Sequence, residues 1–160
     1  MYQRILVPVD GSHTATLGLQ EAVRLAADQR AKLRLIHVVD ELLIAQNFDG
    51  YLNTGELLDS LEAWGKKVLQ NAVALTRRHG VKAEATLFAT TGGRVADVIV
   101  REAKKWKADL IVMGTHGRHG IRRVVLGSDA ETVLRETRVP VLLVRSPGRK
   151  KPAKKRAKKK

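Results

Sequence analysis

The chain contains no cysteine among its 160 residues. That absence excludes disulfide bonds, thiolate metal sites and cysteine nucleophiles, and it is compatible with a reducing compartment. Aromatic residues make up only 4% of the chain, so a core must be built mainly from Val, Leu, Ile and Ala. No apolar run approaches the ~20 residues that cross a membrane, and the first residues lack the pattern of a signal peptide. We therefore expect a cytoplasmic protein without a transmembrane segment.

Acidic residues are absent from the last stretch of the chain, Arg149–Lys160, which carries nine of the 30 Lys and Arg residues. The rest of the chain then holds 21 basic and 16 acidic residues, a net charge of +5. Dense like charge with Pro and Ala favours disorder. We expect a folded domain over residues 1–147 and a disordered basic tail over 148–160.

The tail has two interpretations. It is either a solubility tail or non-native end, or a cation that binds DNA, RNA, polyphosphate or acidic membrane surfaces through counterion release. In the second case the polyanion-binding residues are Arg149, Lys150, Lys151, Lys154, Lys155, Arg156, Lys158, Lys159 and Lys160.

Short apolar runs alternate with segments of helical periodicity along the rest of the chain. Helices are indicated between the runs, the longest over Glu56–His79, and an irregular connection precedes it over Glu41–Gly55. Alternation of this kind predicts an α/β fold, a parallel sheet with helices on both faces, in which ligands bind beyond the carboxyl ends of the strands. The runs with strand character are Arg4–Asp10, Lys32–Asp40, Val81–Thr90, Asp109–Gly114 and Val139–Val144.

Glycines recur in "GTHGRHGIRRVVLGS", with the spacing G-x2-G-x9-G-S from Gly114 to Ser128. This is neither a Walker loop nor the dinucleotide fingerprint. The logic is related, because glycines let the backbone approach a phosphate and Ser128 falls where a helix N-terminus would offer N–H groups. Ser128-x-x-Glu131 is also a capping box, which stabilises a helix without any ligand. The basic residues between the glycines are phosphate contacts or solvated charges: Arg118, Arg122 and Arg123.

Other polar residues have structural readings beside functional ones. Asp10 either begins a turn with Gly11 or contacts a ligand. His37 lies inside an apolar run and is expected in the core, and Trp64 and Trp106 are expected to pack on helix faces. His116 and His119 form only a weak metal signal, since no paired carboxylate lies near them in sequence. No nucleophile elbow or metal-binding motif is present, so enzymatic activity is expected to be at most slow ATP hydrolysis.

Several segments together resemble the universal stress protein family. They occur in the family's order and cover essentially residues 2–145, and the glycine spacing is similar to that of the family's ATP-binding branch. The resemblance implies an open five-stranded parallel sheet of the adenine-nucleotide α-hydrolase-like type, with strand order 3-2-1-4-5. It also implies ATP or AMP in the crevice, with or without Mg. The matching segments are "ILVPVDGS" at Ile5–Ser12, "LIHVVD" at Leu35–Asp40, "ADLIVMGTHGR" at Ala108–Arg118, "LGSDAE" at Leu126–Glu131 and "VPVLLV" at Val139–Val144.

The resemblance assigns roles to residues by their position in these segments. Asp10 would contact the ribose or a phosphate-bound Mg, and Pro8, Val9 and Val38 would line the adenine pocket. Backbone N–H groups and the Ser128 hydroxyl would hold the phosphates. The complete nucleotide-binding set is Pro8, Val9, Asp10, Val38, Met113, Gly114, Gly117, Arg118, Gly127, Ser128 and Asp129.

The last apolar run, Val139–Val144, is expected at the edge of the sheet, where an uncovered apolar strand is an aggregation hazard. The resemblance implies that the edge strands of two subunits pair, which predicts a homodimer. It also implies a nucleotide-dependent regulatory module in the stress response. The alternatives are a dimer that binds DNA or another polyanion through its basic tails, and a slow ATP hydrolase.

Overall fold

The computed structural model describes residues 1–40, 54–115 and 126–146. Strands and helices alternate along these ranges, as the sequence predicts. No helix in the described ranges is long and apolar enough to span a membrane. The elements are β1 (Arg4–Pro8), α1 (His13–Gln29), β2 (Lys32–Asp40), α3 (Thr54–Arg78), β3 (Ala83–Thr90), α4 (Val95–Trp106), β4 (Leu110–Gly114), α5 (Ser128–Glu136) and β5 (Val141–Val144).

Some predicted boundaries are wrong by a few residues. The end of the connection predicted over Glu41–Gly55 is helical, because α3 already begins at Thr54, and residues 41–53 lie outside the described ranges. β1 ends at Pro8, which has no N–H group to continue a ladder, rather than at Asp10. β5 begins only after Pro140, at Val141, for the same reason.

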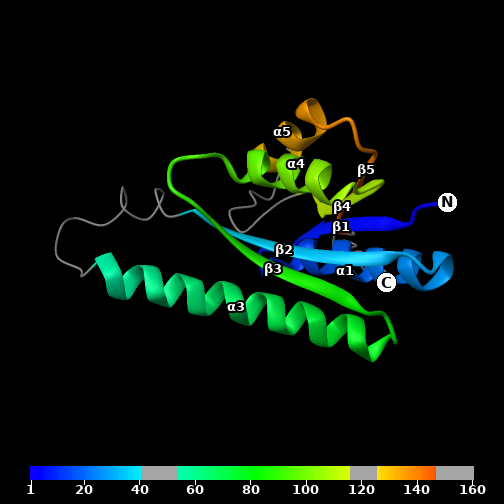
Figure 1. Cartoon of the computed structure of the whole chain (residues 1–160), viewed down its shortest axis with the longest axis horizontal. Coiled ribbons are helices and arrows are strands. Elements are labelled where there is room, and N and C mark those ends of the chain that lie inside the picture. The colour runs from blue at the N-terminus through cyan, green and yellow to red at the C-terminus, as the bar shows by residue number, and fades with distance from the viewer. Residues whose placement is uncertain (41–53, 116–125, 147–160) are drawn as a thin grey trace, which may run out of the picture.

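All five strands form one parallel sheet in the order β3-β2-β1-β4-β5, which confirms the predicted order. β1 lies at the centre, where Ile5 is paired with Leu33 of β2 on one side and Leu110 of β4 on the other. The chain builds outward from β1 to β3, then returns through α4 to add β4 and β5 on the opposite side (Figure 1). The order therefore reverses between β1 and β4, and the carboxyl ends of these two strands mark the expected ligand crevice.

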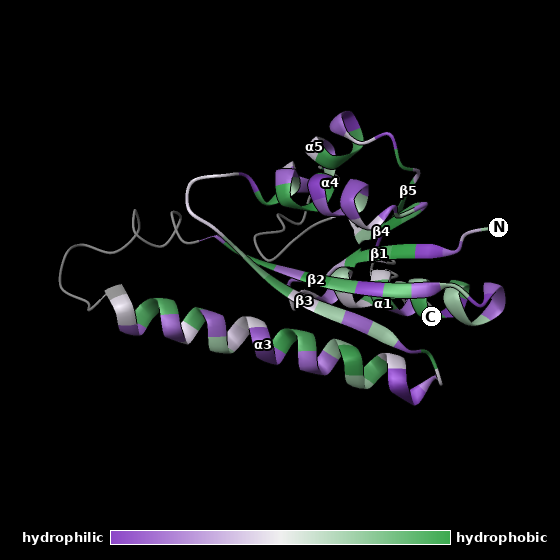
Figure 2. Cartoon of the chain, viewed as in Figure 1, coloured by the Kyte–Doolittle hydropathy of each residue, from purple (hydrophilic) through white to green (hydrophobic). Residues whose placement is uncertain are grey.

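Helices cover both faces of the sheet and produce two apolar cores. Ile5 and Val7 of β1 pack with α1 and α3, whereas Leu6 packs with α4 and α5. Successive side chains of a strand point to opposite faces, so a strand covered on both sides must be apolar throughout. α3 instead alternates hydrophobic and hydrophilic residues along its length, because only one of its sides packs on the sheet (Figure 2).

An ion-pair network that is buried at Glu102 and exposed at Glu84 joins β2, β3 and α4. The guanidinium of Arg34 on β2 pairs with Glu84 on β3 and with Glu102 on α4, and it lies 4.9 Å from the ring centroid of Trp106. Glu102 is only 4% exposed, so it depends on Arg34 for its charge partner. Trp106 also packs against the core formed with α4 and α5, which confirms its predicted packing role.

Candidate functional site

The two ends of the glycine motif meet at the carboxyl end of β4. Thr115, which follows β4, donates its backbone N–H to the carbonyl of Val144 at 3.0 Å and accepts one from the N–H of Gly127 at 2.8 Å. The residues between these anchors include Gly117, Arg118, Arg122 and others, and residues 116–125 lie outside the described ranges. The segment thus leaves and rejoins the sheet at one point, beside the place where the strand order reverses.

The second end of the motif opens helix α5. Gly127 is its N-cap, and the Gly127 carbonyl accepts the first helical hydrogen bond from Glu131 at 2.9 Å. The predicted capping box is therefore wrong, because the cap is a glycine without a side chain and Ser128 is already the first helical residue. The N–H groups of Ser128, Asp129 and Ala130 have no acceptor within the described ranges, as is usual for a helix start. They form a donor cluster at the positive end of the helix dipole.

The turn after β1 forms the opposite side of the crevice. The Asp10 carboxylate accepts a hydrogen bond from the backbone N–H of Ser12 at 2.9 Å, and Gly11 takes a positive φ of 79° that suits glycine. Ser12 then caps α1 by accepting from the N–H of Ala15 at 3.1 Å. The turn reading of Asp10 is confirmed, and this hydrogen bond fixes its carboxylate at the end of β1.

α1 begins directly against the end of β4. A Cβ atom on Gly114 would lie 2.7 to 2.9 Å from backbone atoms of Thr14 and Ala15, closer than real side chains approach. Gly18, one turn later, is also close, since its Cβ would lie 3.3 Å from the backbone of Gly114. The N-terminus of α1 is thereby held beside the anchors of the glycine motif.

Val9 is held in place from β2. Its N–H donates to the Ile36 carbonyl at 2.8 Å, and its own carbonyl accepts from His37 Nδ1 at 2.6 Å. A carbonyl oxygen can only accept, so Nδ1 carries a proton. His37 is 5% exposed and lies 5.1 Å, edge to face, from the ring of Trp64, which confirms it as a core histidine. The side chain of Val9 is buried in the same core, which leaves little of this residue for a ligand.

The other residues assigned to the site fall into two groups. Pro8, at the end of β1, and Val38, near the end of β2, are half-buried. Met113 is buried in the core with α4 and α5, whereas Ser128 and Asp129 are exposed at the start of α5. The described residues thus gather at the carboxyl edge of β1, β2 and β4.

Three carboxylates influence one another at this edge. Partial burial of its carboxyl group, together with the negative charges of Asp10 and Asp40, raises the pKa of Asp129 above its ordinary value. The residue as a whole remains exposed. In the described ranges no group of three or more His, Asp or Glu side chains is placed to hold a metal ion. A cation here would thus need further ligands in addition to one or two protein carboxylates.

Sequence reasoning missed the part that Thr115 and Thr14 play. Thr115 ties both ends of the motif through its backbone, and Thr14 is the surface against which Gly114 packs. A residue of any type can make such a backbone contact, so neither threonine stands out in the sequence. The only sequence signal for the Thr14 contact was the glycine that packs against it, Gly114.

Known proteins share both the sequence and this architecture. The profile of the universal stress protein family matches residues 1–145. Universal stress protein MJ0531 of Methanocaldococcus jannaschii is 35% identical over 150 residues, spanning 92% of this chain and 84% of the relative. The crystal structure of a universal stress protein family member from Burkholderia pseudomallei is 37% identical, with a TM-score of 0.71 over 89% of this chain and 96% of that one.

A third similar protein carries a ligand. The universal stress protein of Archaeoglobus fulgidus in complex with dAMP is 26% identical, with a TM-score of 0.64 over 89% of this chain and 98% of that one. The match to the family profile spans all but the last residue of the described part of the chain. With its sheet order, its glycine spacing and these relatives, the chain belongs to the universal stress protein family.

Proposed function

We propose that the protein binds an adenine nucleotide, ATP or AMP, in the crevice between the carboxyl ends of β1 and β4. The observation that carries the proposal is the closure of the glycine motif. The hydrogen bond from Gly127 to Thr115 holds the start of α5 at the strand end, so the N–H groups of Ser128 and Asp129 face the site with the helix dipole behind them. The dAMP complex of the Archaeoglobus fulgidus relative supports an adenine nucleotide as the ligand.

Different described residues contact different parts of the proposed nucleotide. Pro8 and Val38, half-buried at neighbouring strand ends, supply apolar contacts for the adenine ring. The backbone of Gly114, the donors at the start of α5 and the Ser128 hydroxyl approach the phosphates. Asp10 faces the sugar, with its carboxylate fixed by Ser12.

A magnesium ion fits the site only as part of the nucleotide. Mg²⁺ usually keeps several waters and binds through phosphates plus one or two carboxylates. Asp10 supplies one such carboxylate at the mouth of the crevice, and no larger acidic cluster is needed. When bound, the ion would neutralise phosphate charge that Asp10 and Asp129 otherwise repel.

The proposed role is regulatory, with the bound nucleotide changing the conformation or the partners of the protein during stress. The described carboxylates at this edge include Asp10, Asp40 and Asp129, and we assign none of them as a dedicated base. Any ATP hydrolysis would accordingly be slow.

The test is mass spectrometry of the natively purified protein for retained nucleotide, followed by titration of the stripped protein with ATP and AMP. We expect recovery of an adenine nucleotide and loss of binding in a Gly117→Val variant with unchanged thermal unfolding. A protein that retains no nucleotide and shows no measurable affinity for ATP or AMP contradicts the proposal.

A second activity, polyanion binding, is favoured by the charge of the tail. Nine Lys and Arg residues and no acid lie within Arg149–Lys160, outside the described ranges. We expect salt-sensitive retention of the full chain on DNA, and loss of it when the chain is cut after Pro147. Equal retention of the shortened chain would remove the tail from this role.

Dimer formation is proposed for the other end of the sheet. β5 occupies the edge position, its four residues are all apolar and each is only half-buried. Pairing of two β5 strands would satisfy their free backbone groups and cover these side chains. Light scattering at micromolar concentration should give twice the chain mass, and a single-chain mass would rule the pairing out.

A further inference from the structure

The opposite edge of the sheet, formed by β3, is also open. β3 pairs with β2 over eight residues, from Ala83 to Thr90, and no other described strand lies beside it. An edge strand leaves alternate backbone N–H and C=O groups directed outward, ready to pair with another strand. Such edges are usually protected by inward-pointing charges or bulges. β3 instead presents only Ala and Leu toward α3, namely Ala83, Ala85 and Leu87.

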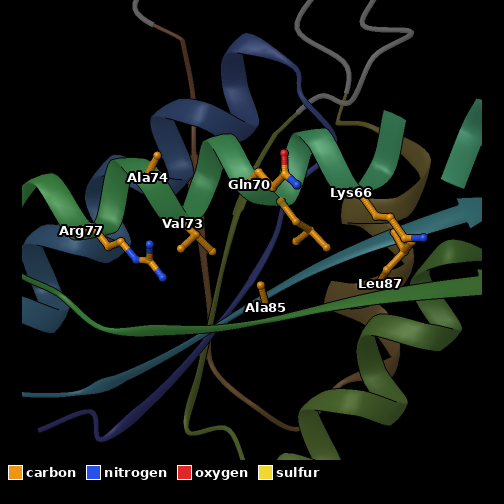
Figure 3. Close-up of a pocket in the computed structure, with 8 residues that line it drawn as sticks. Lys66, Gln70, Val73, Ala74, Arg77, Ala85 and Leu87 are labelled. Carbon is orange, nitrogen blue, oxygen red and sulfur yellow. The ribbon is translucent and has the colours of Figure 1, made fainter. Parts of the chain in front are cut away.

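A groove of about 680 Å³ runs between α3 and this edge (Figure 3). Ala85 and Leu87 form its strand side, and Val73 and Ala74 of α3 line its helix side. Ala74 and Ala85 are exposed and Val73 is half-buried, so the apolar lining is open to solvent. The volume lies within the range of sites that bind small ligands or short peptide segments, about 300–1,000 Å³.

Positive charge flanks the apolar lining. Figure 3 shows Lys66 and Arg77 at opposite ends of the groove, both extending from α3 toward β3. Lys66 is paired with Glu62 at 2.9 Å, whereas Arg77 has no ion pair within the described ranges. No acidic residue occurs between Lys66 and Ala83 in the sequence. The nearest acid on β3, Glu84, is engaged with Arg34 toward α4.

We infer that this groove binds an extended acidic segment of a partner protein, which adds a strand to the sheet beside β3. Three features of the site specify that segment. The open edge supplies main-chain hydrogen bonds, the Ala and Leu lining accepts alternate apolar side chains, and the two cations accept carboxylates. Lys66 and Arg77 are eleven residues apart on a helix, about 16 Å at 1.5 Å per residue. A strand covers that distance in about five residues, which sets the spacing of the acids in the partner.

Charge argues against two occupants from this protein, its basic tail and a second copy of the groove. The basic tail would be repelled by Lys66 and Arg77. A second copy would place its own Lys66 and Arg77 beside those of the first, which would also repel. The groove shares no lining residue with the proposed nucleotide site, and β2 lies between β3 and the β1–β4 junction. The inference thus holds whether or not the crevice binds a nucleotide.

The experiment uses the full chain and synthetic peptides, observed by amide NMR. The probe is an eight-residue peptide of alternating Val and Thr in which Glu replaces residues 2 and 7, five residues apart. Its comparators carry Lys in place of Glu, or N-methyl groups on alternate backbone nitrogens, which block strand pairing. We expect saturable shifts in β3 and in the facing side of α3 with the acidic peptide, and at least tenfold weaker binding of both comparators.

Matched variants test the charges. The double variant Lys66→Glu/Arg77→Glu should weaken the acidic peptide at least tenfold, whereas Lys67→Glu/Arg78→Glu, with the same net charge and neighbouring exposed positions, should change it less than threefold. Equal losses in both variants, equal binding of the N-methylated peptide, or shifts confined to β5 would overturn the inference. So would outward-directed β3 amides, those not bonded to β2, that are already protected from exchange in the free protein, since another segment or copy would then fill the edge.

Discussion

The backbone of Gly114 is in direct contact with the backbone of Thr14. A Cβ atom on Gly114 would lie 2.7 Å from the carbonyl carbon of Thr14 and 2.9 Å from its oxygen. The contact joins the end of β4 to the first turn of α1, two elements that are separated by most of the domain in sequence. The first glycine of the motif is therefore required by the packing of the protein, independently of any ligand.

Replacing Gly114 with Ala should accordingly destabilise the fold. The new methyl group meets backbone atoms that cannot rotate away, and overpacking of this kind costs about 1–3 kcal/mol. Urea unfolding measures the change in the free energy of unfolding. Gly55→Ala is the control, because Gly55 lies exposed in the first turn of α3, where Ala favours the helix. Equal stability of Gly114→Ala and the natural protein would contradict the packing requirement.

Asp10 combines a structural hydrogen bond with a proposed ligand contact, and two substitutions separate them. Asn keeps an oxygen that can accept from the N–H of Ser12, so Asp10→Asn should unfold like the natural protein. Its loss of charge should lower affinity for Mg-ATP about tenfold and remove any enhancement by Mg²⁺. Asp10→Ala should lose both the hydrogen bond from Ser12 and the negative charge, and its free energy of unfolding should fall by about 1 kcal/mol. Calorimetric titration with and without Mg²⁺ decides, and an unchanged Mg²⁺ effect in Asp10→Asn would exclude the metal role.

Asp129 should make nucleotide binding pH-dependent. Its raised pKa comes from partial burial and from Asp10 and Asp40, so the carboxyl group is protonated at a higher pH than an ordinary aspartate. Above that pKa its negative charge opposes a phosphate, and below it the repulsion is lost. Affinity for ATP should consequently rise as the pH falls through the pKa of Asp129.

The matched variant is Asp129→Asn. At pH 8 it should bind ATP several-fold more tightly than the natural protein, and the two affinities should converge as acid protonates Asp129. The comparison at each pH cancels the titration of the phosphate itself. Tighter binding by the natural protein at pH 8 would show that the carboxylate assists the ligand.

Arg34 should be among the most sensitive positions outside the site. Arg34→Met leaves Glu102, whose side chain is 5% exposed, without its charge partner, and uncompensated buried charges cost about 3–5 kcal/mol. Changing Glu102 to Leu as well should recover part of that loss. Glu84→Gln, at the exposed partner, should cost under about 1 kcal/mol. Thermal or urea unfolding of the four proteins tests this, and a double variant no more stable than Arg34→Met would show that the pair is not coupled.

The fold could be predicted from the sequence because every strand and every helix carries its own hydrophobic pattern. Most strands are apolar runs, β3 alternates apolar and polar residues, and the helices are amphipathic, so the order of elements and the edge position of β5 could be predicted before any contact was known. Element ends were less certain, since they depend on single residues. The end of β1 at Pro8 agrees with the fraying that its missing N–H group predicts, whereas the later start of β5, after Pro140, was not predicted.

The site was predictable in place but only partly in detail. Its position follows from topology, while the role of individual groups depends on backbone contacts. The sequence favoured Ser128 as a helix cap, yet Gly127 occupies that position because its N–H is fixed by Thr115. The groove beside α3 was not foreseen, because Lys66, Val73 and Arg77 resemble ordinary positions on a solvated helix until β3 is placed beside them.

Because Gly127 and Thr115 are hydrogen-bonded, the positions of the two ends of the glycine segment do not depend on the length of the segment. Eleven residues intervene, from 116 to 126, and both chain ends are already fixed to the sheet and to α5. Lengthening a closed loop adds little entropy cost, about 0.6 kcal/mol for each doubling. Insertions and substitutions between the anchors are thus tolerated by the scaffold. Residues in this stretch can therefore change without a large cost to the stability of the fold.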